Sequence, residues 1–147
     1  KFALQLPDKP SIAVLPFENF SSDPEQGYFA DGMTEDLITD LSKLSGVFVI
    51  SRNSSWTYKN KAVKPQQVAE ELGVRYVLEG SVRSAGKRLR VTVQLIDAIN
   101  DHHVWAEKYD GDVEDVFDFQ DHISGQIASI VEPEVTAAEI KRASRRP

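Results

Sequence analysis

The stretch YVLEGSVRSAGKRLRVTVQLI, residues 76–96, alternates apolar and polar residues on both sides of the short turn SAGK. A period of two residues is typical of a strand with one buried face and one face in water. A second turn, INDHH (99–103), leads into VWAEKYD (104–110). We therefore predict a three-stranded antiparallel meander with one wet face. After the first turn, the residues expected to point inward are Leu89, Val91, Val93 and Leu95, and those expected to point outward are Arg88, Arg90, Thr92 and Gln94.

Upstream of the meander, two short apolar runs are typical of buried strands: SIAVLPF (11–17) and VFVIS (47–51). Between them, apolar side chains recur at helical spacing, and Ser45-Gly46 ends the predicted helix. That stripe consists of Phe29, Met33, Leu37, Ile38, Leu41 and Leu44.

Two further helices are expected. The polar segment RNSSWTYKNKAV (52–63) is interpreted as a loop, and a short helix follows it from Pro65 to Gly73. Downstream of the meander, an apolar stripe predicts a last helix, with Pro133 as a candidate interruption. This stripe contains Val116, Phe119, Ile123, Ile127, Ile130 and Val131.

The order strand, helix, strand, helix, three strands, helix predicts an α/β (α+β) fold. We expect a mixed sheet of about five strands with helices packed on one face. Residues 1–10 contain two prolines and are interpreted as a linker, residues 11–133 as the α/β domain, and residues 134–147 as the helical start of a connection to a following domain. Both ends look cut, so we expect a domain from a longer protein.

Composition excludes several functional classes. The chain of 147 residues has a net charge of −6, with 23 acidic and 17 basic residues. This charge argues against nucleic acid and anionic membranes as partners, because both attract positive surfaces. The absence of cysteine excludes disulfides, thiolate metal sites and cysteine nucleophiles. No apolar run approaches the roughly 20 residues of a membrane span.

The stretch DPEQGYFADGMTEDL (23–37) could be mistaken for a phosphate-binding loop. Its glycines, Gly27 and Gly32, are five residues apart, no lysine accompanies them, and the local charge would repel phosphate. We interpret the stretch as a structural junction in which Ser22 and Glu25 form a capping box. The small residues Gly27, Ala30 and Gly32 would then lie where the helix passes closely over the sheet.

Two other segments, one acidic and one with adjacent histidines, do not match the residue patterns of metal sites. In YDGDVEDVFDFQD (109–121), Asp115 and Asp121 stand where a calcium-binding EF-hand loop needs glycine and glutamate. His102 and His103 are adjacent, so on a strand their side chains point to opposite faces. No GxSxG nucleophile motif is present. We expect no cofactor, no metal and no catalytic residue in this segment.

A basic cluster stands out on this acidic chain. Around the first meander turn lie Arg83, Lys87, Arg88 and Arg90. They form either a solvated face or a contact for an acidic partner or a neighbouring domain. Trp56 and Trp105 are candidates either for the edge of the core or for interface anchors.

Three blocks then appear in order along the chain: IAVLPFENFSSDPEQGYFADGMTEDLITDLSKLSGVFVISRNSSW (12–56), ELGVRYVLEGSVRSAGKRLRVTVQLIDA (71–98) and HVWAEKYDGDVEDVFDFQDHI (103–123). Together they resemble the TolB-like amino-terminal domain of bacterial signalling proteins, over about residues 10–133. The cyclase-linked versions from soil alphaproteobacteria are the most similar. In this family the domain typically follows a class III adenylate/guanylate cyclase domain or a winged-helix regulator, and it precedes tetratricopeptide repeats.

The resemblance implies the fold of the TolB amino-terminal domain and a parent chain that is an adenylate cyclase, a lyase. Class III cyclases hold their two metal ions on a separate catalytic domain, so this segment itself carries none of that activity. The family has no established catalytic residues that could be transferred to this chain. Cyclase chemistry uses cytosolic nucleoside triphosphate, which favours the cytoplasm, whereas TolB itself works in the periplasm.

We therefore expect a non-catalytic interaction or regulatory domain of a multidomain signalling protein. Its expected partners are proteins, either neighbouring domains of the same chain or a second copy. The alternative is a small-molecule sensor with a pocket beside the first helix and the meander. An enzyme in its own right is the third hypothesis, and it would need a cleft of converging acids and histidines that the spacing does not suggest.

Overall fold

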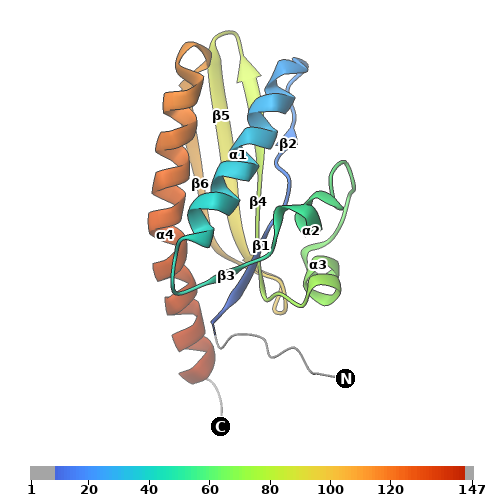
Figure 1. The fold of residues 1–147 in the computed structure, drawn as a ribbon, viewed down its shortest axis with the longest axis vertical. Helices are drawn as coiled ribbons and strands as arrows, with labels where there is room; N and C mark the ends of the chain where they lie inside the picture. Colours follow the sequence, from blue (N-terminus) through green and yellow to red (C-terminus); the bar gives the residue numbers. More distant parts are fainter. Residues whose placement is uncertain (1–8, 145–147) are drawn as a thin grey trace.

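The computed structural model describes residues 9–144, which fold as a mixed sheet flanked by helices (Figure 1). The predicted linker, residues 1–10, lies almost entirely outside this range. The sheet contains β1 (Ser11–Val14), β2 (Glu18–Asn19), β3 (Phe48–Val49), β4 (Tyr76–Ala85), β5 (Arg88–Asp97) and β6 (His102–Asp112). Five strands run in the order β3-β1-β4-β5-β6, and β2 pairs with β4 off this path. The expected mixed α+β fold is confirmed.

The predicted meander forms one side of the sheet, with β6 as the edge strand. β4, β5 and β6 are antiparallel neighbours, whereas β1 is parallel to β3 and to β4. The β4–β5 register places Glu79 opposite Gln94, Ser81 opposite Thr92, and Arg83 opposite Arg90. These side chains remain partly or fully exposed, while Val82, Leu89, Val91 and Val93 on the other face are buried. The predicted wet face is therefore confirmed for this part of the sheet.

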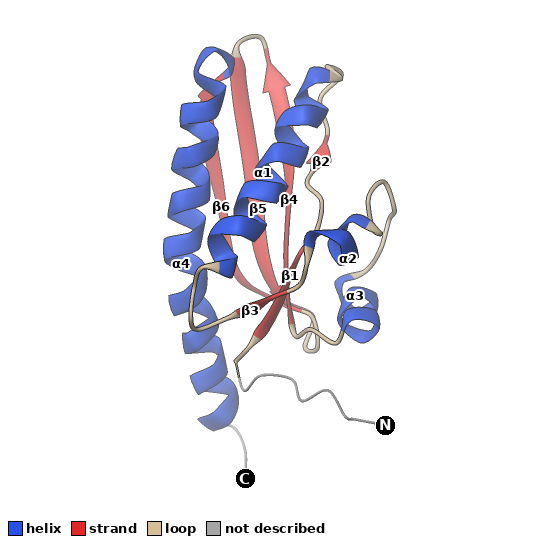
Figure 2. Cartoon of the chain, viewed as in Figure 1, coloured by secondary structure: helices blue, strands red, loops and turns tan. Residues whose placement is uncertain are grey.

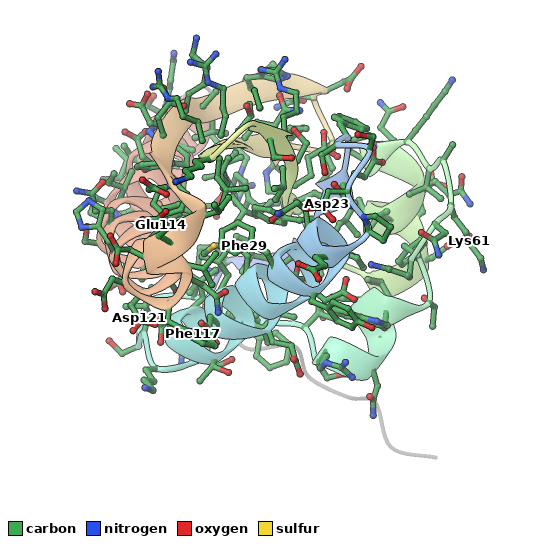
Figure 3. The ribbon with its side chains drawn as sticks, turned by 90° about the horizontal axis from the view of Figure 1, so that it is seen from above. Asp23, Phe29, Lys61, Glu114, Phe117 and Asp121 are labelled. Carbon is green, nitrogen blue, oxygen red and sulfur yellow. The ribbon has the colours of Figure 1, made fainter. Side chains whose placement is uncertain are left out.

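The two longest helices cover the inner face of the sheet. α1 (Glu25–Ser42) and α4 (Val116–Ser144) lie side by side over the meander (Figure 2). Viewed from the hairpin end, Phe29 lies between the two helices (Figure 3). Its ring stacks on Phe119 of α4, with the ring centroids 6.0 Å apart. The main core therefore joins the apolar stripes of both helices to the inward side chains of the sheet.

The expectation that helices pack on one face only is wrong. α2 (Arg52–Trp56) and α3 (Pro65–Leu72) lie on the side of the opposite face, where a second core contains Val68 of α3 and Val77 of β4. β1 contributes Ala13 to this core, while Ile12 and Val14 belong to the main core. A strand that is apolar on both faces needs a cover on each side. The apolar run SIAVLPF predicts that both faces of β1 are buried, but it does not identify the element that covers the second face.

Three local expectations also need correction. The segment expected to be a loop from residue 52 begins with α2, and the Ser51 side chain accepts a hydrogen bond from the Ser54 amide at the start of this helix. At the start of α1, Asp23 rather than Ser22 accepts a hydrogen bond from the Glu25 amide, at 3.0 Å. A β-carbon added at Gly32 would lie 3.3 Å from the Gln120 amide group, so Gly32 allows α1 to approach α4 and not the sheet.

Helix α4 continues through Pro133, so the interruption suggested at that residue does not occur. Residues beyond the proline are held by tertiary contacts: Val135 is buried in the main core, and Glu139 accepts a hydrogen bond from the Tyr76 hydroxyl at 2.5 Å. These contacts offset the hydrogen bond that proline cannot donate. The division between the domain and a following segment stays a prediction.

Candidate interaction surface

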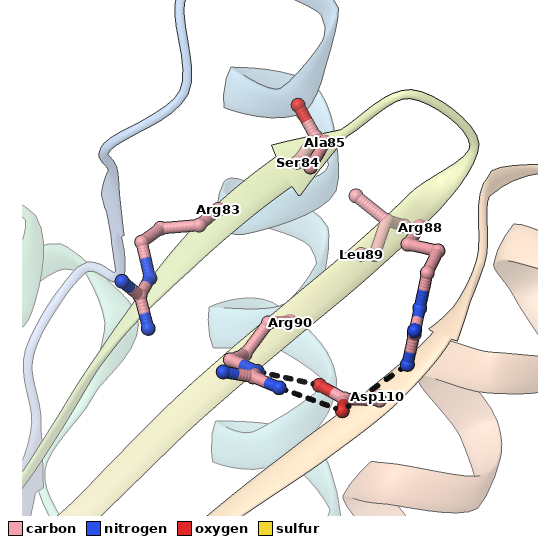
Figure 4. A pocket seen from close by; sticks show the side chains of 7 residues that line it. All are labelled: Arg83, Ser84, Ala85, Arg88, Leu89, Arg90 and Asp110. Carbon is pink, nitrogen blue, oxygen red and sulfur yellow. Dashed lines mark hydrogen bonds and ion pairs between the residues drawn. The ribbon is translucent and has the colours of Figure 1, made fainter.

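The basic cluster predicted from the sequence lies at one end of the sheet. We call Arg83, Lys87, Arg88 and Arg90 the basic hairpin surface. Arg83 is on β4, Lys87 is in the turn, and Arg88 and Arg90 are on β5. Cα pairing of Arg83 with Arg90 and of Ala85 with Arg88 puts the three arginines on the same, outward face. The structure therefore brings these predicted residues together, and Figure 4 shows the three arginines.

Asp110 of β6 organises two of these arginines. It pairs with Arg90 through two hydrogen bonds, Nε to Oδ1 at 2.7 Å and Nη2 to Oδ2 at 3.0 Å. The Arg88 guanidinium lies 3.5 Å from Oδ2 of the same carboxylate. Hydrogen bonding to Arg90 lowers the pKa of Asp110, and the same contact raises the pKa of Arg90. The bidentate geometry fixes the orientation of Arg90 and neutralises part of the charge.

The remaining two cations differ from each other. Lys87 lies 3.0 Å from Glu114, but both side chains are well exposed, so this pair contributes little to stability. Arg83 is exposed, and within residues 9–144 its side chain makes no hydrogen bond or ion pair. Figure 4 shows it apart from the Arg90–Asp110 pair. Arg83 is therefore available to an acidic group from outside the domain.

The two candidate tryptophans lie elsewhere. The Arg52 guanidinium stands 4.2 Å from the centroid of the Trp56 ring, and the Lys59 ammonium group 5.9 Å from it. Both cations also pair with acids of α1, Arg52 with Glu35 and Lys59 with Asp31. Trp56 therefore belongs to the contact between α1 and α2.

Trp105 of β6 is partly buried and packs against the main core. It pairs with the inward-facing Leu95, on the face of the sheet away from the arginines. The structure thus does not bring Trp56 or Trp105 to the basic hairpin surface.

Sequence reasoning missed three strongly exposed aromatic residues. Their exposed fractions are 62% for Phe20, 81% for Tyr28 and 76% for Phe117. Tyr28 and Phe117 fall outside the helical spacing of the apolar stripes in α1 and α4. This spacing could have shown that both side chains face away from the core.

Sequence reasoning also did not identify the residues that line a large cleft on the outward face of the sheet. We call it the outer-face cleft; its volume is about 990 Å³. Its floor contains Glu79, Ser81, Thr92 and Gln94 from β4 and β5, and its walls are the segments 15–20 and 58–64. The Gln94 side-chain amide donates a hydrogen bond to Glu79 at 2.9 Å. Burial, together with the nearby charge of Glu18, raises the pKa of Glu79. Hydroxyl, amide and carboxyl groups thus converge in one hollow.

Among the residues that the structure describes, no group of three histidine, aspartate or glutamate side chains could hold a metal ion. Asp110 is engaged by the arginines, and Asp112 accepts a hydrogen bond from the Glu114 amide. His102 and His103 are both exposed on β6. Between residues 9 and 144, no helix is long and apolar enough to cross a membrane.

Comparison with known protein families decides the relationship of this chain. Residues 8–126 match the family described as the second domain of HilA/YgeH-like transcriptional regulators. The chain belongs to this family. The match includes β1, the helices α1 to α3 and the whole meander, and it ends within α4. The basic hairpin surface and the outer-face cleft thus lie within the HilA/YgeH-like second domain.

A curated relative of this HilA/YgeH-like domain is the Rhizobium meliloti (strain 1021) protein named "Putative adenylate cyclase 3". The two are 58% identical over 142 residues, which are 97% of this chain and 24% of the relative. The chain thus spans about a quarter of the relative's length.

Solved structures show the same fold at low identity. Lipoprotein GNA1162 from Neisseria meningitidis has a TM-score of 0.60 at 20% identity, over 82% of this chain and 99% of that one. TolB from Acinetobacter baumannii has a TM-score of 0.56 at 18% identity, over 84% of this chain and 29% of that one. The expected TolB-like fold is confirmed. Tetratricopeptide repeats in the parent chain stay a prediction.

Proposed function

We propose that this chain is a non-catalytic interaction domain of a multidomain signalling protein, and that it docks an acidic protein surface through the basic hairpin surface. The observation that carries the proposal is the exposed, unpaired Arg83 within the described residues, beside an Arg90 held in place by Asp110. Cations on a chain of net charge −6 are favourable contacts for an acidic partner and repel basic surfaces.

The partner is another domain of the same protein or a second copy of it. A relative named as an adenylate cyclase supports this context, because the similarity to that longer protein covers only a quarter of its length. In this proposal the cyclase, a lyase, lies outside residues 1–147. The cytoplasm is the proposed compartment, since a cyclase needs nucleoside triphosphate there.

Zero-length carbodiimide cross-linking of the full-length protein tests the proposal, because this reagent joins lysines to contacting carboxylates. Lys87 should form cross-links to acidic residues outside the domain or in a second copy. Arg83→Glu should reduce their yield about 10-fold, because the loss of one good charge contact costs about 1.4 kcal/mol. Arg83 is the appropriate position because reversing Arg90 would also break its pair with Asp110.

Lys43→Glu is the matched control. It makes the same charge change just after the end of α1, where the exposed Lys43 side chain lies 3.9 Å from Asp40 and makes no other ion pair within residues 9–144. It should leave the Lys87 cross-links unchanged. Equal losses in both variants would indicate a general charge effect, and an unchanged yield in Arg83→Glu would reject the basic hairpin surface as the docking site.

A further inference from the structure

The outer-face cleft lies in the part of the sheet that α3 does not cover. Its floor is formed by two cross-strand pairs, Glu79 with Gln94 and Ser81 with Thr92. Neither the Ser81 nor the Thr92 hydroxyl makes a hydrogen bond to other side chains within residues 9–144. A volume of about 990 Å³ lies at the upper end of the range of small-molecule sites, about 300–1,000 Å³. The floor therefore offers unused hydrogen-bonding groups in a cavity of suitable size.

The charged side chains of the cleft lie at different depths. Glu79 is half-buried in the floor, and no lysine or arginine pairs with it in the described part of the chain. Glu18, which pairs with Ser81 across β2 and β4, adds a second carboxylate. On the rim, Lys61 and Lys64 are exposed. A partly buried charge interacts more strongly with a ligand than an exposed one, because solvent screens it less.

Burial is the main cause of the raised pKa of Glu79, and the charge of Glu18 adds to it. The hydrogen bond from Gln94 and, to a smaller extent, the neighbouring His103 of β6 offset this rise only in part. The raised pKa means that ionisation of Glu79 costs more free energy than in water. An ammonium group placed beside Glu79 would favour the ionised carboxylate and offset this cost.

We propose that the outer-face cleft binds a small zwitterion, with its ammonium group on Glu79 and its carboxylate toward Lys61 and Lys64. A ligand with only a positive charge would be repelled by the lysines of the rim, and a ligand with only a negative charge by Glu79 of the floor and Glu18 of the wall. The exposed ring of Phe20 in the wall provides an apolar surface for the carbon chain between the two charged ends. This inference does not depend on the basic hairpin surface.

The test is a calorimetric titration of the protein with three matched series of probes: the ω-amino acids from β-alanine to ε-aminocaproate, and the n-alkylamines and alkanoates of the same chain lengths. At least one ω-amino acid should bind about 10-fold more tightly than the amine and the alkanoate of equal length. The amide NMR signals of Ser81 and Thr92 should shift with the same affinity. The assignment would be overturned if no ω-amino acid saturates below about 20 mM, or if an alkanoate binds equally well.

Two variants assign the two ends of the ligand. Glu79→Gln keeps an oxygen that can accept the Gln94 hydrogen bond, and it should weaken binding about 10-fold. Glu107→Gln is the control, because Glu107 is exposed and pairs with the inward-facing Val93, away from the cleft. Lys64→Gln, at an exposed rim position, should weaken the ω-amino acids but not the alkylamines. Unchanged affinity in both Glu79→Gln and Lys64→Gln would reject the proposal, and Lys64→Gln remains decisive if Glu79→Gln does not fold.

Discussion

Two tyrosine hydroxyls of the sheet differ in their hydrogen bonding. The Tyr76 side chain is fully buried, and its hydroxyl donates a hydrogen bond to Glu139 of α4 at 2.5 Å. The Tyr109 hydroxyl is also buried but has no hydrogen-bond partner among the described residues. Burial raises the pKa of both phenols, and hydrogen bonding to Glu139 raises that of Tyr76 further. Both hydroxyls thus stay protonated at neutral pH, but only the Tyr76 hydroxyl contributes a hydrogen bond to the fold.

Removal of each hydroxyl tests this difference. Tyr76→Phe should lower the free energy of unfolding by about 1.5–3 kcal/mol, because the lost hydrogen bond is made to a charged acceptor. Tyr109→Phe is the matched control and should leave stability unchanged or slightly higher, because it removes an unsatisfied buried group. Urea denaturation of the two variants measures both values. An equal loss in both would contradict the role given to the Tyr76–Glu139 hydrogen bond.

At the residue scale, the outward arginines were predictable and their partner was not. Arg88 and Arg90 follow from the alternation in β5, because neighbouring side chains of a strand point to opposite faces. The pair between Arg90 and Asp110 joins residues 20 positions apart and requires the β5–β6 register. The register itself contains an irregularity between Leu95 and Ile96, which no local pattern indicated.

At the element scale, one carboxylate provides the polar contacts between the last part of α4 and the sheet, in addition to the burial of Val135 in the main core. Glu139 accepts a hydrogen bond from Arg142 on the same helix at 2.6 Å and another from Tyr76 of β4. Arg75, which precedes β4, lies 3.8 Å away and also pairs with the buried Asp97. The hydrogen bond with Arg142 is the main cause of a lowered pKa of Glu139. Part of the docking of α4 beyond Pro133 therefore depends on the ionised form of this residue.

This dependence predicts an effect of pH. A carboxyl whose pKa is lower in the folded state stabilises the fold above its unfolded pKa, about 4.3 for glutamate, and this contribution is lost as the pH falls through the folded value. Glu139→Gln should therefore be less stable than the parent protein at pH 7, and the difference should shrink as the pH falls below about 4.3. Urea denaturation at a series of pH values measures it. Glu70→Gln, at an exposed carboxyl of α3 with no ion pair among residues 9–144, should show a much smaller difference at every pH.

At the scale of the whole molecule, the two cores are unequal. The main core joins α1, α4 and the inner face of the sheet, whereas the second core rests on α3, parts of β1 and β4, and the neighbouring loops. α3 has eight residues, of which only Val68 and Ala69 are buried. Short elements with few buried contacts open at lower free energy than the rest of a fold. The α2–α3 layer is therefore the less stable side of the molecule.

Hydrogen exchange followed by mass spectrometry tests this ranking. Amides of α3 should exchange at least about 10-fold faster than those in the middle of α1 and β5, because a local opening that costs about 1.4 kcal/mol less is about 10-fold more populated. The terminal turns of α1 serve as an internal control for ordinary fraying. Equal protection of α3 and the middle of α1 would instead indicate that both cores open in one cooperative step.

The sequence alone determined most of the elements and the orientation of their side chains, but not the short elements α2 and β2. The meander, the stripe of α1, the bounds of α3 with Gly73 after its last turn, and the outward basic cluster all follow from periods of two or 3.6 residues and from local backbone preferences. Only the tertiary structure decided that α3 covers the second face of β1, that α4 continues through Pro133, and that Glu79 and Gln94 meet in a cleft. These features depend on contacts between residues far apart in the chain, and periodicity describes only how a segment distributes its own side chains, not which other segment meets them.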